Sequence, residues 1–225
     1  MSQSCQIEVL RGHKSSSSTD QLELMFARRA LALLKTRLGS EGLKDLLASD
    51  IAKAESYWRQ KLAESDGKFR ETSIKLTATG LSAEQFLTWF KRHVENMPVM
   101  LAAHPEHFIN GFGTVLETLG EHVSLFDLQM MAEPADCVAI RDPDTYPIAL
   151  NGAAVLADGT KMGYACHQFR NVSSLGGVGG LEAYLAGFLP QTVEDVVVET
   201  QQHHLTVEWS NWIRAAHADL VASAS

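Results

Sequence analysis

The chain is organised around the stretch QHHLTVEWSNW, residues 202–212 of 225. As a helix, this stretch places His204 and Glu208 on the same face, because side chains four residues apart stack along a helix. Leu205 and two tryptophans recur at helical spacing and form an apolar stripe beside that pair. An imidazole and a carboxylate are costly to desolvate there unless something partners them. The pair is a candidate for binding a divalent metal ion; the ordinary alternative is a surface pair worth about 0.3 kcal/mol.

The composition is that of a globular protein with an acidic surface. Hydrophobic residues make up 45% of the chain, which is enough for a sizeable core. The formal net charge is -8, whereas a nucleic-acid partner is normally met by a basic stripe. No run approaches the ~18 apolar residues of a membrane span, and the first residues lack the order of a signal peptide. We therefore expect a cytoplasmic protein with neither a nucleic-acid nor a membrane partner.

Histidines, rather than cysteines, are the candidate metal ligands. Cys5, Cys137 and Cys166 are odd in number and have no CxxC spacing, so we interpret them as reduced thiols. Seven of the nine histidines fall between His93 and His204, where most of the apolar pattern also lies. Histidine is the commonest protein metal ligand and the natural acid or base near neutral pH.

Three regions are predicted. Residues 1–19 contain a serine tract and are predicted to be flexible. Residues 20–66 carry two helical patterns separated at Gly39, which predicts a helical hairpin. Its apolar stripes either form a homodimer surface or pack on the rest of the chain. Residues 67–225 form the third region.

The third region alternates strand and helix patterns in the order expected of an α+β fold. A capping box at Ser82 opens a helix, and a long helix is predicted from about Glu199. The glycine-rich segment 176–180 lacks the setting of a dinucleotide site and is interpreted as a mobile loop. We expect a curved antiparallel sheet that grips the long C-terminal helix around an apolar pocket. The predicted strands are 69–79, 114–119, 123–131, 136–140, 149–156, 161–170 and 181–188.

In the expected fold, several histidine and glutamate side chains that could bind a metal ion lie around that pocket. Either His104 or His107, together with Glu117, joins the pair on the last helix to give two imidazoles and two carboxylates. Nitrogen and oxygen ligands without cysteine suit zinc, with manganese and iron as alternatives. His167, on a strand of the same sheet, is a candidate acid or base. Each residue also has an ordinary explanation, since Glu117 faces solvent if the strand register shifts by one residue.

The order of these motifs resembles the family of diacetylphloroglucinol hydrolases and phloretin hydrolases. These are zinc-dependent enzymes with a helix-grip, or Bet v 1-like, catalytic domain. The resemblance covers about residues 69–220. It rests on LSAEQF (81–86) through HPEH (104–107), VLETLG (115–120), HQFR (167–170) before the glycines, and HLTVE (204–208).

The resemblance implies a site in which zinc is held by a histidine, a glutamate and a His/Glu pair four residues apart on the last helix. The last pair corresponds to His204 and Glu208. The first histidine corresponds to His107, because Asn110 follows at the place of a substrate-contacting asparagine; His104 is the alternative. The first glutamate corresponds to Glu117, with Glu121 as the alternative. The acid/base histidine resembles His167, and a phenol-contacting tyrosine resembles Tyr184.

The activity implied by the resemblance is hydrolysis of a carbon–carbon bond in a ketonic substrate. Metal-activated water would cleave the bond that joins an acyl group to a polyhydroxylated aromatic ring, as in an acylphloroglucinol. Two alternatives stay open. One is a metal-free helix-grip protein that binds or cyclises a small molecule, and the other is a metal-dependent ester or lactone hydrolase.

Overall fold

The computed structural model describes residues 18–111, 113–173 and 179–224. The chain forms two compact units, residues 1–37 and 38–225. The described part of the first unit is helical, and most of the predicted flexible N-terminus lies outside the described residues. Helix α1 (Thr19–Ser65) is two helices joined at Gly39, which has a φ of 63° and a ψ of 179°. The predicted break at Gly39 is therefore confirmed, while the hairpin arrangement stays a prediction.

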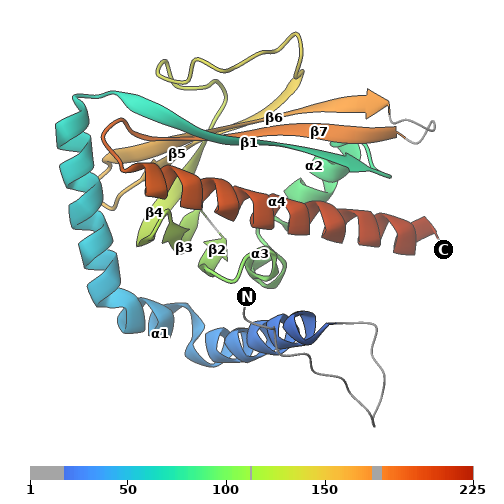
Figure 1. Cartoon of the computed structure of the whole chain (residues 1–225), viewed down its shortest axis with the longest axis horizontal. Coiled ribbons are helices and arrows are strands. Elements are labelled where there is room, and N and C mark those ends of the chain that lie inside the picture. Colours follow the sequence, from blue (N-terminus) through green and yellow to red (C-terminus); the bar gives the residue numbers. More distant parts are fainter. Residues whose placement is uncertain (1–17, 112, 174–178, 225) are drawn as a thin grey trace, which may run out of the picture. The chain divides into compact units, whose positions relative to one another are not determined.

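The second unit is built on one curled antiparallel sheet. Its strands are β1 (Phe69–Thr79), β2 (His107–Gly111), β3 (Thr114–Leu119), β4 (His122–Met131), β5 (Ile148–Val155), β6 (Lys161–Ser173) and β7 (Gly179–Pro190). Their order across the seven-stranded sheet is β1-β7-β6-β5-β4-β3-β2. The sheet curls around the long helix α4 (Asp195–Ala224), and the short helices α2 (Ala83–His93) and α3 (Met97–Ala103) lie beside α4 (Figure 1). The α+β class with an antiparallel sheet around a long helix is confirmed.

Local sequence signals explain the short helices. The Ser82 side chain accepts the backbone N–H of Gln85, and the Gln85 side chain accepts the backbone N–H of Ser82. This reciprocal capping box starts α2 where the sequence predicts it. Pro98 lies in the first turn of α3, where a missing N–H costs nothing.

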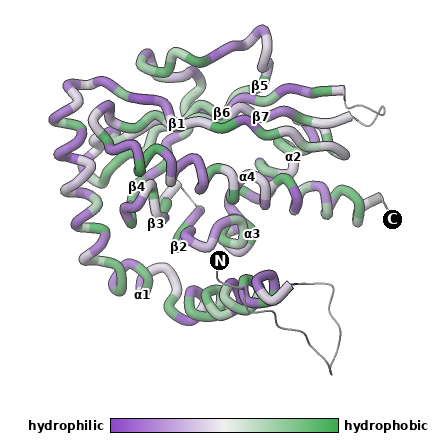
Figure 2. Tube along the Cα trace, in the orientation of Figure 1, coloured by the Kyte–Doolittle hydropathy of each residue, from purple (hydrophilic) through white to green (hydrophobic). Residues whose placement is uncertain are grey.

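The main core lies between the inner face of the sheet and α4. Phe86, Phe169 and Leu185 are fully buried and pack with Leu205 and Trp209 of α4. Hydrophobic and hydrophilic residues alternate along α4 (Figure 2), as expected for a helix that buries one side. Because strand side chains alternate, one face of each strand contributes to this core and the other faces away from it.

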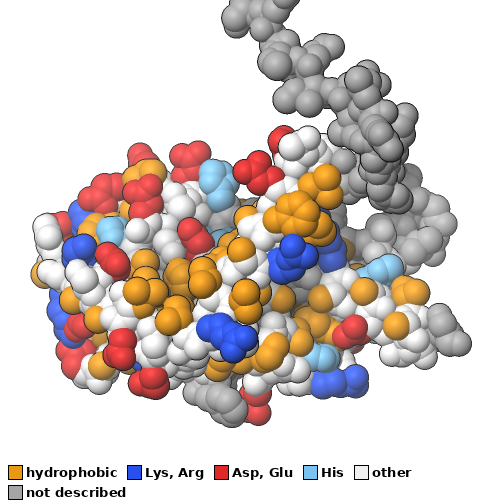
Figure 3. Space-filling view, turned by 90° about the horizontal axis from the view of Figure 1, so that it is seen from below, with side chains coloured by type: hydrophobic (Ala, Val, Ile, Leu, Met, Phe, Trp, Pro, Cys, Tyr) orange, Lys and Arg blue, Asp and Glu red, His pale blue; other side chains and the backbone are white. Residues whose placement is uncertain are grey.

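Apolar side chains also reach the surface. Leu24, Met25, Phe26, Leu33 and Leu34 of the first unit are exposed. On the face in Figure 3, hydrophobic side chains lie among scattered acidic and basic ones. No helix among the described residues has both the length and the apolarity needed to cross a bilayer.

One predicted strand is wrong, and one predicted helix begins earlier than expected. Residues 136–140 are turns rather than a strand. The buried Gln168 side chain donates to the carbonyl of Ile140 and accepts the N–H of Asp142, so the loop obtains hydrogen bonds that a strand would have needed from a neighbour.

The long helix begins at Asp195 rather than near Glu199. The run Val196 to Val198 is β-rich in sequence but helical in the structure. Val197 is only 2% exposed and packs in a cluster with Trp58, so tertiary packing outweighs its intrinsic preference.

Gly120 provides a test of how closely α4 approaches the sheet. Its φ is +64°, and a Cβ atom there would lie 2.5 Å from Cγ1 of Val197. Gly159 has a φ of +87° with no atom within 4 Å of that position, so it is a matched control. We expect Gly159→Ala to lower the free energy of unfolding by about 1 kcal/mol. Gly120→Ala should cost about 1–3 kcal/mol more because of the added clash. Urea unfolding measures both, and equal losses would contradict the packing described.

Candidate metal centre

Four buried side chains from three elements meet between the sheet and α4. His107 begins β2, Glu117 lies on β3, and His204 and Glu208 lie one turn apart on α4. The antiparallel register pairs His107 directly with Glu117. The four ligand atoms lie within 4.8 Å of one another. Two residues from the sheet and two from the helix therefore form a single cluster.

The spacing of these atoms suits one metal ion. His107 Nε2 lies 3.1 Å from His204 Nε2 and 3.4 Å from both Glu117 Oε2 and Glu208 Oε1. His204 Nε2 lies 3.9 Å from Glu117 Oε2. A tetrahedral ion with ligands at about 2.0–2.1 Å would separate its ligand atoms by roughly 3.3 Å. Two imidazoles and two carboxylates at this spacing form a donor set that fits zinc, although the geometry does not select zinc over other divalent ions.

Hydrogen bonding decides between His107 and His104. A second group of His104, His107 and His204 also brings ligand atoms together. His107 Nδ1 lies 3.2 Å from the carbonyl of Met100, so it carries a proton and leaves Nε2 with a lone pair. His104 Nδ1 instead accepts the N–H of Glu106 at 3.1 Å, which puts the proton of its neutral ring on Nε2. His107 is therefore the better ligand, and His104 stacks on His204 at 4.0 Å between ring centroids.

Burial decides between Glu117 and Glu121. Glu121 is exposed in the turn between β3 and β4, outside the cluster. Glu117 is 8% exposed and lines the cavity, on the same side of β3 as Val115 and Leu119. The strand alternation predicted from sequence therefore holds at Glu117.

The cluster is electrostatically costly without a cation. Burial raises the pKa of Glu117 to about 8, with a smaller contribution from Glu106. Burial also raises the pKa of Glu208 well above its usual range, and the Glu117 carboxylate adds to that effect. Burial lowers the pKa of His204, and His104 and His107 lower it further. A divalent cation would offset two carboxylates and accept the imidazole lone pairs.

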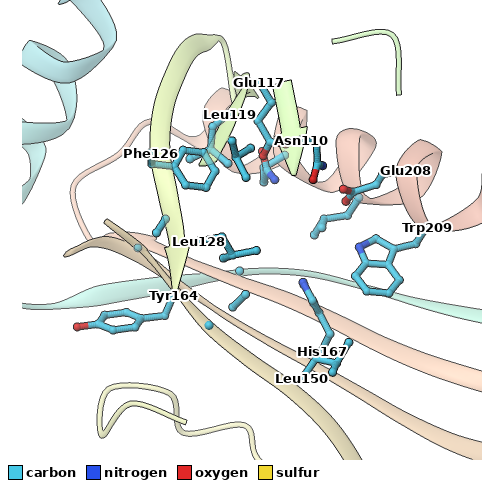
Figure 4. A pocket seen from close by; sticks show the side chains of 18 of the residues that line it. Asn110, Glu117, Leu119, Phe126, Leu128, Leu150, Tyr164, His167, Glu208 and Trp209 are labelled. Carbon is cyan, nitrogen blue, oxygen red and sulfur yellow. The ribbon is translucent and has the colours of Figure 1, made fainter. Parts of the chain in front are cut away.

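The cluster opens onto a cavity of about 180 Å³ between the sheet and α4. Most of its lining is apolar, including Leu128, Leu150 and Phe126. Figure 4 shows Asn110, Glu117 and Glu208 along one side and His167 on the other. The polar groups are few and lie at the two sides of an apolar space, which is the usual pattern of a small-molecule site.

His167 lies across this cavity rather than in the metal cluster. It lies on β6 and points into the cavity, where its ring packs edge-on to Trp209 at 4.7 Å between centroids (Figure 4). Its Nδ1 is buried and has no hydrogen-bond partner among the described residues. Burial lowers the pKa of His167 to about 4, so the ring is neutral at pH 7. One of its ring nitrogens therefore carries a proton and the other a lone pair.

Asn110 lines the cavity, but Tyr184 does not. On β7, Tyr184 pairs with Gln168, whereas Leu185 pairs with His167, so Tyr184 lies on the outer face of the sheet. Its hydroxyl donates to Glu71 Oε1 at 2.7 Å. The predicted contact between Tyr184 and a substrate in this cavity is therefore wrong, because the Tyr184 side chain lies on the opposite face of the sheet.

The sequence did not single out Gln201. It lies three residues before His204 on α4, lines the cavity, and accepts the N–H of Gly120 at 3.1 Å. The sequence could have indicated Gln201 through its spacing of three residues from His204, because residues i and i+3 lie on the same face of a helix. Trp209 and Trp212 were expected in the core, and both also line the cavity.

A comparison with known protein families and with curated proteins finds no match to this chain. The candidate metal centre therefore rests on the geometry and chemistry of its own residues. That geometry brings together all four ligands preferred from the sequence and leaves out the alternative glutamate.

The buried carboxyls predict how stability depends on pH. Between pH 6.5 and 8, Glu117 is ionised in the unfolded chain but largely protonated in the metal-free fold, because its folded pKa is about 8. His204 and His167 are neutral in the fold, whereas in the unfolded chain each holds about half a proton at pH 6.5 and almost none at pH 8, which offsets a smaller part of this difference. The metal-free fold thus holds more protons, so its stability should fall as pH rises. The slope is up to about 1.4 kcal/mol per pH unit for each such carboxyl.

Urea unfolding in EDTA at pH 6.5 and pH 8 measures this slope. Glu117→Gln should flatten it, whereas Glu121→Gln, at an exposed turn, should leave it unchanged. Added zinc should remove the loss at pH 8. A metal-free protein that becomes more stable over this range would contradict the protonation states described.

Proposed function

We propose that the protein is a metal-dependent hydrolase that cleaves the carbon–carbon bond between an acyl group and a polyhydroxylated aromatic ring. The observation that carries the proposal is the pairing of a buried His₂Glu₂ cluster with a neutral histidine across one small apolar cavity. The curled sheet around a long helix supports assignment to the helix-grip, or Bet v 1-like, architecture. The motif resemblance described above supplies the substrate class.

His107, Glu117, His204 and Glu208 would hold the metal ion, with zinc as the proposed identity. When bound, such an ion acts as a Lewis acid and supplies a water-derived nucleophile near neutral pH. The apolar walls exclude bulk water, which strengthens electrostatic interactions at the cluster. The residues around the ligands hold them in place, since Met100 fixes the tautomer of His107 through its carbonyl.

The cavity supports a ligand with a single aromatic ring. At about 180 Å³ it is smaller than the pockets that bind drug-sized molecules. An apolar cavity of about 150 Å³ is known to bind benzene. Asn110 and His167 offer hydrogen bonds at its wall, which favours a ring that carries hydroxyl groups.

His167 would move a proton between substrate atoms. Its ring would take the proton of a ring hydroxyl only transiently and return it to the ring carbon that carries the acyl group, giving a keto tautomer. Overall, one water is consumed: its oxygen joins the acyl carbon to give a carboxylic acid. The bond between acyl carbon and ring carbon breaks, and the ring keeps the hydrogen in place of the acyl group.

Two other functions use the same cavity without this step. A metal-free binding or cyclase protein would need neither the cluster's ligand geometry nor a metal. A metal-dependent ester or lactone hydrolase would need the metal but not a proton on a ring carbon. The position of His167 across from the cluster favours the carbon–carbon hydrolase over both.

Metal content tests the ligand set. We expect protein purified without added metal to hold about one divalent ion per chain. His204→Ala and Glu208→Gln should lower metal content and activity together, because each removes one ligand. His203→Ala is the matched control, since His203 is exposed on the same helix. Mass spectrometry of metal content gives the readout, and normal metal in both ligand variants would remove the cluster from the proposal.

His167 tests the reaction class. With 2,4,6-trihydroxyacetophenone as substrate, His167→Asn should lower kcat about 100- to 10,000-fold, as expected for loss of a general acid or base. Metal content should stay normal because His167 lies outside the cluster. Phenyl acetate is assayed beside the ketone. Turnover of the ester alone, unaffected by His167→Asn, would favour the ester hydrolase.

A further inference from the structure

Two tryptophans at the cavity wall have indole N–H groups that make no hydrogen bond of normal geometry among the described residues. These groups, Nε1 of Trp209 and Nε1 of Trp212, are both buried. The Trp209 N–H nevertheless lies near the Glu208 carboxyl and lowers its pKa, against the larger effect of burial. The other two tryptophans, Trp58 and Trp89, each donate at 2.8 Å, to a serine hydroxyl and to an aspartate carboxylate. An indole N–H is only a donor, so a buried one requires an acceptor. At the cavity wall that acceptor can belong to a ligand.

Trp209 is the better placed of the two. Its side chain is 2% exposed, and its nitrogen is on the side of the ring that faces the cavity, between Glu208 and His167 (Figure 4). Its ring contacts that of His167 at 4.7 Å between centroids. Trp212 packs against Phe90 at 5.2 Å and against His107 at 6.0 Å between ring centroids, farther into the helix layer.

We propose that Trp209 donates its indole N–H to a carbonyl oxygen of the bound ligand, so that the cavity selects aromatic ketones over hydrocarbons of the same shape. The identity of that carbonyl rests on the proposed function. With the ring beside His167 and the acyl group towards the metal cluster, the carbonyl oxygen lies between them, next to Trp209. Charge that develops on this oxygen during attack would be stabilised by the same donor.

The competing role for this N–H is to hold the carboxylate of Glu208, the preceding residue on α4. That role would make Trp209 a positioning residue for the cluster. It predicts loss of metal on substitution, and it predicts no preference among ligands. The two roles therefore differ in what a binding measurement shows.

A pair of matched ligands tests the donor directly. Acetophenone and α-methylstyrene have the same shape but carry C=O and C=CH₂, and neither has the ring hydroxyl that the proposed cleavage requires. Dissociation constants are measured on the full chain, both as purified and after metal removal. The wild type should bind acetophenone more tightly. In Trp209→Phe the ratio of the two constants should fall about 2- to 10-fold, as for loss of one neutral hydrogen bond.

Trp89→Phe is the control, because Trp89 is buried in the same core but bonds to Asp219 away from the cavity. It should leave the ratio unchanged. The proposal is overturned if Trp209→Phe also leaves the ratio unchanged, or if the wild type binds acetophenone no more tightly than α-methylstyrene. Loss of metal in Trp209→Phe with an unchanged ratio would support the positioning role instead.

A second measurement needs no substitution at the cavity. The indole ¹H–¹⁵N resonance of Trp209 should move downfield when the wild type is saturated with acetophenone but not with α-methylstyrene. The resonance of Trp58, which already donates to Ser124, should not respond. An unmoved Trp209 resonance contradicts the proposal. Neither measurement depends on turnover, so the hydrolase proposal can fail while the ketone preference holds, and the reverse.

Discussion

The structure depends on burying two imidazoles and two carboxylates at one point between α4 and the β2–β3 edge of the sheet. Desolvation opposes the charged form of every one of these groups whose pKa is resolved, raising Glu117 and Glu208 and lowering His204. Such a cluster is tolerated only if protons or a cation neutralise it. A divalent ion would balance the two carboxylate charges, so metal binding would stabilise the contact between α4 and the sheet.

Hydrogen bonds away from the cluster fix the position of α4. Thr72 of β1 donates its hydroxyl to the carbonyl of Val198 at 2.9 Å, near the start of the helix. Asn211 donates to the carbonyl of Ala103 at 2.7 Å, where α3 ends just before β2. These contacts lie on either side of His204 and Glu208 along the helix. They hold the ligands of α4 opposite His107 without using any cluster atom, so the site is preorganised by its surroundings.

Local periodicity made much of this predictable from sequence. The pair His204 and Glu208 needed only helical spacing, and Glu117 needed only the alternation of a short apolar strand. Distinguishing His107 from His104 was different, because it depends on which ring nitrogen meets a carbonyl and which meets an N–H, and those partners lie in the surrounding backbone. The prediction for Tyr184 was wrong for a related reason. The motif match gave no strand register, and a shift of one residue along a strand moves a side chain to the other face of the sheet.

The arrangement also places a constraint on what the cavity can bind. Its apolar wall gains from an aromatic ring, yet its few polar groups lie at opposite sides, with His167 across from the cluster. A purely apolar ligand would offer no hydrogen-bond acceptor or donor to His167 Nδ1 and Trp209 Nε1. A ligand with oxygen atoms at both ends of a ring satisfies both sides at once. Buried polar groups of this kind strongly disfavour a ligand that lacks the matching oxygen atom. Apolar contacts distinguish less strongly between ligands of different shape. Under the proposed function, the selectivity of the site would come from His167 and Trp209, and its affinity from its apolar walls.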